Sequence, residues 1–425
     1  MSFQTGLSGL NASAKNLDVI GNNIANSNTV GAKSSRAEFA AVVASAIGPS
    51  GGGGAAGGGI GVEVSTVSQQ FSQGTINITG NNLDCAINGG GFFELTLKDG
   101  SAAYTRDGQF KLDSKGNLIT NSGASVMGFA TDVAGNTTST SISPLVVPTG
   151  APIAANATTA ITAQFNLDAR AVIATPAPPS AVMVPPYTTY GTTMNGYDAQ
   201  GVVVPIKLYF IKTAADSWDI YDGDPAAIAD PAAVPPVVTG VKVNTAFPLQ
   251  FDPSGNIDPA VVTGTMDVTL TSTNPNIGTF VVTLDVSKAT QYGTSFAISD
   301  LTQDGYTAGT LTGISISEQG VITTRYSNGQ SQATGQLALA DFRNVQGLKP
   351  VGQGNWVEST TSGQPIQGAP GQGNFGTVNS GSLESSNVDL TAELVAMMTA
   401  QRDYQANAQT IKTQDTVLQT LVNLR

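Results

Sequence analysis

Few residues of this sequence could support catalysis or bind a metal ion. The chain contains no histidine, which excludes Ser-His-Asp and Cys-His nucleophiles and every histidine-ligated metal site. The single cysteine, Cys85, can form neither an internal disulfide nor a thiolate zinc cluster, and its apolar neighbours predict a small buried residue. We therefore expect no catalytic residues, no metal site and no cofactor.

Two charged patterns resemble functional sites but lack the context that such sites require. Arg106-Asp107 could form a catalytic pair, yet the turn signals around it favour a solvent-exposed charge pair in a hairpin. Four aspartates between Asp216 and Asp224 miss the spacing of a calcium-binding loop, which favours an ordinary turn. The 30 acidic residues could still supply the two carboxylates of an extracellular glycosidase, but no spacing singles out a pair.

The net charge and the hydropathy of the chain argue against some classes of binding partner. The net charge of −12 would repel a phosphate backbone or an anionic membrane, so we expect no nucleic acid partner. No apolar run approaches the roughly 18 residues of a membrane-spanning helix, and we expect no membrane insertion. The N-terminus lacks the basic region and apolar block of a cleaved secretory signal peptide. If the protein leaves the cytoplasm, another export route must carry it.

The helices around which we expect the rest of the chain to be organised are predicted at its two ends. From Ser382 to Arg425 the sequence has no glycine or proline. Ser386 and Asp389 predict a capping box at the start of a helix. Apolar residues then recur at spacings of three and four, which is typical of a coiled-coil seam and requires a partner. The seam comprises Leu390, Leu394, Met397, Tyr404, Ala408, Ile411, Leu418 and Val422.

A second amphipathic helix is predicted at the N-terminus. Apolar residues again recur at spacings of three and four, which places them on one face of the helix. These residues are Phe3, Leu7, Leu10, Ala14, Leu17 and Ile24. Burying these six side chains offsets only part of the cost of ordering the backbone. We therefore expect the terminal helices to fold when other copies of the chain supply the missing surface. The alternative is that the two helices pack as a pair on their own domain.

Between the helices, alternating apolar residues and Gly-containing turns predict short strands. The acidic residues of 149–289 are all Asp, and prolines are frequent there, which favours an inserted β-sandwich or barrel. The expected fold class is mixed and mainly β. We expect a terminal helical polymerisation domain with a coiled-coil layer (1–46 and 378–425), a Gly-rich linker (47–61), a discontinuous inner β-domain (62–148 and 290–377) and the inserted outer β-domain (149–289).

Several motifs resemble those of a known family. The run Gly-Asn-Asn-Ile-Ala-Asn-Ser-Asn-Thr-Val-Gly-Ala-Lys (21–33) resembles the N-terminal signature of the bacterial flagellar rod and hook proteins, which usually have an aromatic residue where this chain has Ala32. The run Gly-Ser-Leu-Glu-Ser-Ser-Asn-Val-Asp-Leu (381–390) is similar to their C-terminal signature, and 104–110 to their β-domain. The stretch 195–201 resembles the outer domain of hook proteins, which rod proteins lack.

The resemblance implies a structural subunit and not an enzyme. It implies self-assembly into a curved extracellular tube, the flagellar hook, which acts as a universal joint between rod and filament. Implied partners are copies of the chain itself, the distal rod protein, the hook cap protein, the hook–filament junction protein and the flagellar type III export apparatus. The alternatives are a distal rod protein, a free-standing adhesin and an extracellular enzyme.

The assembly interface is predicted to be the inner helical layer of this tube. Non-closing contacts between terminal helices build helical filaments, which supports the same conclusion independently of the resemblance. The Gly-rich linker is expected to let the layers move relative to each other. The predicted interface residues are Phe3, Leu7, Leu10, Leu17, Ile24, Leu390, Leu394, Met397, Tyr404, Ile411 and Leu418.

Overall fold

The structure is a computed structural model that describes residues 2–43, 59–150, 152–176, 183–184, 188–223, 228–230, 237–238, 248–259, 264–272 and 277–423. The chain divides into two compact units. Unit 1 comprises Met1–Gly150, Thr312–Arg325 and Ser331–Arg425, and unit 2 comprises Ala151–Leu311 and Tyr326–Gln330. Unit 2 is therefore an insertion between the two halves of unit 1.

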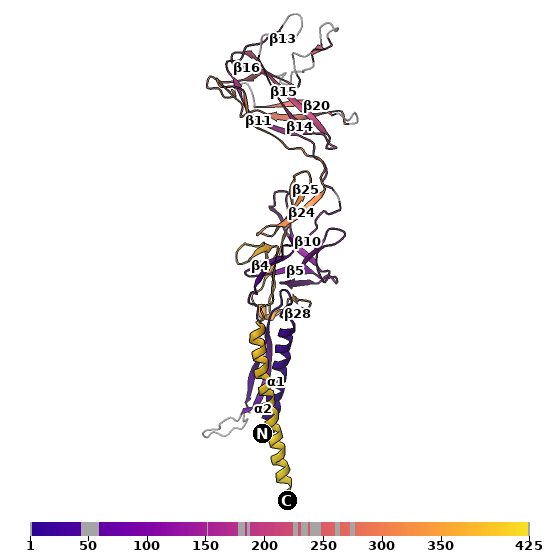
Figure 1. Cartoon of the computed structure of the whole chain (residues 1–425), viewed down its shortest axis with the longest axis vertical. Helices are drawn as coiled ribbons and strands as arrows, with labels where there is room; N and C mark the ends of the chain where they lie inside the picture. Colours follow the sequence, from indigo (N-terminus) through magenta and orange to yellow (C-terminus); the bar gives the residue numbers. More distant parts are fainter. Residues whose placement is uncertain are drawn as a thin grey trace. The chain divides into compact units, whose positions relative to one another are not determined.

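Two long helices from the ends of the chain lie side by side in unit 1 (Figure 1). Helix α1 spans Ser2–Ala25 and helix α2 spans Leu390–Asn423. Asp389 caps α2, because its Oδ1 accepts hydrogen bonds from Thr391 N (2.9 Å) and Ala392 N (3.1 Å). Within the described residues, neither helix combines the length and apolar character needed to cross a bilayer.

The capping box predicted for Ser386 and Asp389 is not formed. Ser386 Oγ accepts a hydrogen bond from Val388 N (3.3 Å) in the segment ahead of α2, and Asp389 alone is the N-cap. The reason lies in Asn387, whose side-chain amide bonds Gln70 O at 2.7 Å. This bond holds the segment against the β-part of unit 1, so the helix starts only after it.

The β-part of unit 1 is built around one large sheet. Its strands follow the order β24-β25-β26-β9-β5-β6-β29-β28, with five further strands paired beside this path among the described residues. The bounds along the path are β24 (Leu311–Ile316), β25 (Val321–Tyr326), β26 (Ser331–Leu337), β9 (Ser125–Thr131), β5 (Phe92–Thr96), β6 (Ala102–Thr105), β29 (Asn355–Val357) and β28 (Lys349–Gly352). The remaining strands are β7 (Phe110–Leu112), β8 (Leu118–Thr120), β10 (Thr137–Pro144), β27 (Leu339–Asp341) and β30 (Ile366–Gly368).

Aromatic side chains form one part of the core of this sheet. Phe92 contacts Trp356 edge-to-face, with ring centroids 5.7 Å apart, and also packs against Phe342. The Trp356 indole donates a hydrogen bond to Gln69 Oε1 at 2.7 Å, which satisfies its buried N–H. Because Gln69 is the last residue of strand β2 (Gly59–Gln69), this bond connects the first half of the chain to the second.

Three short antiparallel pairs complete unit 1. They are β1 (Ser35–Val43) with β2 (Gly59–Gln69), β3 (Ile76–Ile78) with β32 (Ser382–Glu384), and β4 (Cys85–Asn88) with β31 (Thr377–Ser380). The last two pairs each join a strand that follows α1 in the chain to a strand that precedes α2. Of the predicted linker, residues 47–58 lie outside the described residues, and 59–61 begin β2.

Cys85 is fully buried in β4, as predicted. Burial, with a smaller contribution from the nearby Asp84 carboxylate, raises the pKa of its thiol to about 12. Gly108 lies so close that a Cβ atom there would overlap the Cys85 carbonyl oxygen. The thiol therefore stays protonated and shielded at neutral pH, and it behaves as a small core residue.

Unit 2 contains two sheets that share one hydrophobic core. The first has strands β11 (Ala160–Asp168), β20 (Thr265–Thr271), β21 (Thr279–Asp285), β22 (Thr290–Tyr292) and β23 (Ala297–Gln303), and the second has β14 (Thr189–Tyr197), β15 (Val203–Ala214), β16 (Ser217–Tyr221) and β19 (Leu249–Gln250). Burial alternates along β11 and β15, and Phe165 of one sheet meets Phe210 of the other with centroids 4.5 Å apart. The mainly β fold with terminal helices and an inserted sandwich is confirmed.

Several features of unit 2 bear on what the sequence predicted for the inserted domain. The strands β22 and β23 lie beyond residue 289, yet both pair with β11. The sheet of unit 2 therefore continues to Gln303 instead of ending at the predicted boundary. Two further short pairs are described, β12 (Thr175–Pro176) with β13 (Met183–Val184) and β17 (Ile228–Asp230) with β18 (Val237–Val238). Asp224, one of the four clustered aspartates, lies outside the described residues.

Candidate assembly interface

The two terminal helices pack against each other in antiparallel orientation. Gly6 of α1 lies opposite Ile411 of α2, where an added Cβ would approach Ile411 Cγ1 to 3.1 Å. Gly9 lies opposite Asn407, with a corresponding distance of 3.0 Å. The Asn407 side chain also donates to Ser13 Oγ (3.2 Å). Small residues on α1 therefore let the two helix axes approach closely. The terminal helices thus pack as a pair within one chain, which is the alternative arrangement considered in the sequence analysis.

The asparagine-rich end of α1 fixes this pair to the rest of unit 1. Asn23 is buried, and its amide nitrogen donates to Ser35 O (2.8 Å) and to Glu393 Oε1 (2.9 Å). Its oxygen accepts a hydrogen bond from Ser35 N at 2.8 Å. One side chain thus ties α1 to both β1 and α2. The sequence indicated only a helix end here, because the spacing of a single Asn gives no information on distant partners.

The predicted interface residues fall into two groups in the structure. One group is partly covered within the chain, and Ile411 in particular contacts Gly6. The other group is exposed. The partly covered residues are Leu10, Leu17, Ile24, Met397 and Ile411; the exposed ones are Leu7, Leu390, Leu394, Tyr404 and Leu418, and the side chain of Phe3 lies outside the described set.

Helix α2 exposes apolar residues that the predicted coiled-coil seam does not include. Leu390, Leu394 and Met398 recur at a spacing of four and form one stripe on the helix. At the other end, Val417 and Leu418 lie beyond the start of α1, since Gly6 already faces Ile411; Figure 1 shows α2 extending past the N-terminus. The exposed α2 set comprises Leu390, Leu394, Val395, Met398, Tyr404, Val417 and Leu418. These residues expose more apolar surface than isolated surface side chains do.

A buried ion-pair cluster joins both terminal segments to the β-part of unit 1. Its centre is the fully buried Glu384, whose Oε1 lies 2.6 Å from Lys33 Nζ and whose Oε2 lies 3.1 Å from Arg106 Nη1. Gly74 N also donates to Oε1 at 2.8 Å. Burial lowers the pKa values of Lys33 and Arg106, whereas the Glu384 carboxylate favours their charged forms. One carboxylate therefore holds two buried cations.

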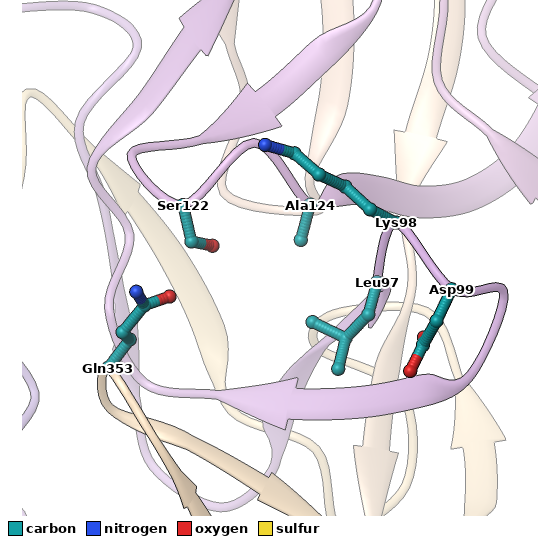
Figure 2. Close-up of a pocket in the computed structure, with 6 residues that line it drawn as sticks. All are labelled: Leu97, Lys98, Asp99, Ser122, Ala124 and Gln353. Atoms are coloured by element: carbon teal, nitrogen blue, oxygen red, sulfur yellow. The ribbon is translucent and has the colours of Figure 1, made fainter.

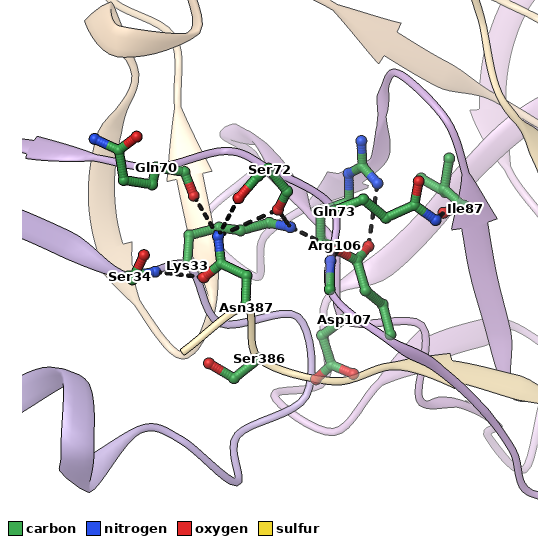
Figure 3. Close-up of polar contacts among 12 residues, drawn as sticks. Lys33, Ser34, Gln70, Ser72, Gln73, Ile87, Arg106, Asp107, Ser386 and Asn387 are labelled. Carbon is green, nitrogen blue, oxygen red and sulfur yellow. Dashed lines mark hydrogen bonds and ion pairs between the residues drawn. The ribbon is translucent and has the colours of Figure 1, made fainter. Parts of the chain in front are cut away.

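The neighbouring Asn387 extends this cluster (Figure 3). Its amide nitrogen donates to the Gln70 carbonyl (2.7 Å) and to the Ser72 hydroxyl (2.9 Å), and its oxygen accepts from Ser34 N (2.7 Å). Lys33 Nζ donates a second bond to Ser72 O at 2.8 Å. Residues of the two terminal signatures thus act together to hold distant chain segments in contact.

The prediction of a solvent-exposed Arg106–Asp107 pair is wrong. Arg106 is only 5% exposed, and it pairs with Glu384 while its Nη2 donates to Gly89 O at 2.8 Å. Its guanidinium also lies 5.3 Å from the centre of the Phe92 ring. Asp107 Oδ1 instead accepts a hydrogen bond from Gln109 N. The distant carboxylate attracts the guanidinium inward, which the local turn pattern could not indicate.

Gly31 is a sensitive point of the same cluster. It has φ +68°, its N–H donates to Glu384 O (2.8 Å), and an added Cβ would lie 2.7 Å from the Arg106 carbonyl carbon. We expect Gly31→Ala to lower the free energy of unfolding of unit 1 by about 2–3 kcal/mol, because a strained φ combines with a backbone clash. Urea denaturation measures this loss. The matched control is Gly80→Ala, at φ +77° with open space around it; equal losses in both variants would contradict the clash.

A pocket of unit 1 has charged side chains in its lining. The shallow pocket of Figure 2 has a volume of about 280 Å³ and is lined by Lys98, Asp99 and Ser122, among others. Asp99 accepts hydrogen bonds from the backbone and hydroxyl of Ser101, so it serves a turn. No group of three His, Cys, Asp or Glu residues that could hold a metal ion occurs among the described residues.

Four family models match successive parts of the chain. They are the flagella basal body rod protein model (3–33), the flagellar hook protein FlgE/F/G D1 domain (86–159), the flagellar basal body protein FlaE D2 domain (166–306) and the flagellar basal body rod FlgEFG protein C-terminal model (379–424). The first and last matches contain the two terminal signatures, and the D2 match lies within the inserted part.

Relatives match over the full length of the chain. The flagellar hook protein FlgE of Salmonella typhimurium is 39% identical over 428 residues, covering all of both chains, and that of Rhizobium meliloti is 33% identical, covering all of this chain and 98% of the relative. The crystal structure of flagellar hook protein FlgE2 from Helicobacter pylori has a similar fold, with a TM-score of 0.54 at 16% identity over 73% of this chain and 100% of that one. The chain thus belongs to the flagellar hook protein FlgE family, and it is a structural subunit of the hook.

Proposed function

We propose that copies of this chain polymerise into a curved tube in which the terminal helices form the inner layer. The observation that carries the proposal is the exposed α2 set, in which Leu394 is 46% and Leu418 is 52% exposed in the single chain. Apolar side chains of this size are stabilised when another surface removes them from water. The predicted interface residues, including Leu7 on α1, are therefore proposed as contacts between subunits.

The proposed tube acts as a universal joint that transmits torque while it bends. Contacts between subunits that do not close on themselves build open helical assemblies. In this proposal the helices of residues 1–46 and 378–425 assemble around the axis, and the β-parts stack outside them. The outer domain is proposed to continue past 289 to residue 303, where the pairing of β23 ends. The low charged fraction of 11% suits outer contacts that re-form during bending.

The proposal includes the neighbours of the hook. These are the distal rod protein, the hook cap protein, the hook–filament junction protein and the flagellar type III export apparatus, all inferred from the family. The proposal also includes export through this apparatus without a cleaved signal peptide. The role proposed is structural and not catalytic.

Immunogold electron microscopy of flagellated cells tests the proposal. An antibody against residues 149–289 should label a short curved segment at the base of the filament. A second antibody against residues 390–423 provides the control, and it should label only dissociated subunits because α2 lies inside the tube. Label that is absent from the curved segment, or scattered over the cell envelope, would favour the rod or adhesin alternative instead.

A further inference from the structure

An open groove lies at one end of the large sheet of unit 1. It has a volume of about 500 Å³ and is lined by apolar and polar side chains; of the apolar ones, Ile316 and Val378 are buried and Ile78 is exposed. Ile78 is 88% exposed, so nearly all of its surface is in contact with water. Exposed Glu318 contributes a negative charge to the same groove. This combination fits an occupant that has an apolar group beside a cation.

The opposite end of the same sheet presents such a pair. The strand order begins at β24, whose last residue is Ile316 in the groove, and it ends at β28. In β28, Lys349 and Val351 are two residues apart, and the pairing of β28 with β29 is interrupted by a β-bulge between Pro350 and Gly352. Both are exposed, Val351 by 51%. We refer to these two residues as the β28 edge.

Pro350 determines how the β28 edge can be used. It lies between the two exposed side chains and has no backbone N–H, which limits the addition of another strand to this end of the sheet. A contact at the β28 edge is therefore made through side chains and not through a strand ladder. A groove with one exposed isoleucine and one exposed carboxylate provides that type of contact.

We propose that the groove of one subunit binds the β28 edge of a second copy of the chain. Val351 then covers the exposed Ile78, while Lys349 pairs with Glu318. Because groove and edge lie at opposite ends of one sheet, each subunit uses both, and the contact repeats without closing. The inference rests on the proposed self-assembly, and it assigns a specific contact between the β-parts of neighbouring subunits.

Other exposed apolar side chains of the described β-part match the groove less well. Val133 is 65% exposed, but it follows Asp132, whose carboxylate would oppose Glu318. Val146 has no charged residue within two positions, and the same holds for Ile366. Outside the β1–β2 hairpin, Val351 is thus the exposed apolar residue of the described β-part that has a cation, Lys349, within two positions and no carboxylate beside it.

Cysteine cross-linking tests the contact in the full chain. Ile78→Cys and Val351→Cys subunits are mixed under polymerising conditions and treated with a short bifunctional maleimide. Cys85 does not interfere, because it is fully buried and its thiol pKa is raised to about 12. We expect covalent heterodimers in the mixture and a ladder of oligomers from the double variant. The matched control mixes Ile78→Cys with Val133→Cys subunits, and it should give no heterodimer above background.

Charge reversal provides a second, independent readout. Glu318→Lys and Lys349→Glu should each raise the critical concentration for polymerisation about fivefold, and the double variant should restore it. Polymers that form normally but give no 78–351 cross-link, or link 78 to 133 equally well, would overturn this contact and leave the proposed function intact. Unaltered subunits that never polymerise would overturn both.

Discussion

Replacing Leu394 and Leu418 with aspartate should abolish polymerisation while leaving the single chain folded. Both leucines are about half exposed in the subunit, so a carboxylate at either position remains in water. In the proposed polymer the same positions become buried, and an unpaired buried charge costs several kcal/mol. A penalty of about 3 kcal/mol per site raises the critical concentration more than about 100-fold. The effect is therefore larger than that of any single lost apolar contact.

Electron microscopy and sedimentation of the double variant measure this loss. Thr399→Asp is the matched control, because it places the same charge at an exposed polar position of α2 and removes no apolar side chain. An unchanged urea midpoint of the monomer would show that the fold is intact. Tubes that assemble at the concentration needed by the unaltered chain would refute the assignment of the helices to the inner layer.

Glu384→Ala should destabilise unit 1 more than any other single carboxylate removal proposed here. The substitution leaves Lys33 and Arg106 buried without their shared counter-charge. Breaking a buried pair by removing one partner typically costs about 3–5 kcal/mol. Here two cations lose the same partner, and Gly74 N loses its acceptor as well.

Tryptophan fluorescence can follow this loss in unit 1 alone. The chain has two tryptophans, Trp218 in unit 2 and Trp356 in unit 1, so Trp218→Phe leaves Trp356 as the reporter. Glu63→Ala, at an exposed strand position, serves as the control and should change the free energy of unfolding by less than about 0.5 kcal/mol. Adding Lys33→Met to Glu384→Ala should recover part of the stability. Strictly additive losses would argue against a shared ion-pair cluster.

The sequence predicted the elements whose signals are local. Two amphipathic helices, a buried Cys85 and a sandwich with alternating strands all follow from spacing within a short window of the chain. The inserted outer domain was expected from a change in composition, since Pro and Asp replace Glu between 149 and 289. Its end could not be placed, because β22 and β23 resemble any other short strands until their partner β11 is known.

The ion-pair cluster could not be predicted in the same way. Glu384 is separated by 351 residues from Lys33 and by 278 from Arg106, and no periodicity relates positions so far apart. For a related reason, the sequence did not show which of the predicted interface residues are covered within the chain and which are exposed. Periodicity shows that a helix has an apolar face, but it does not show which neighbour covers it. Gly6 and Gly9, which allow the close helix pair, carry no apolar signal at all.

The position of Glu384 in the chain has a consequence for the order of folding. A ribosome completes Lys33 and Arg106 long before Glu384, which comes within the last tenth of the sequence. Until then neither cation has its counter-charge, and α1 has no α2 to pack against. Closing a contact over 351 residues is slow, because non-local contacts form late. A chain truncated before Glu384 cannot form this contact, so the cluster closes only after about nine tenths of the sequence has been made.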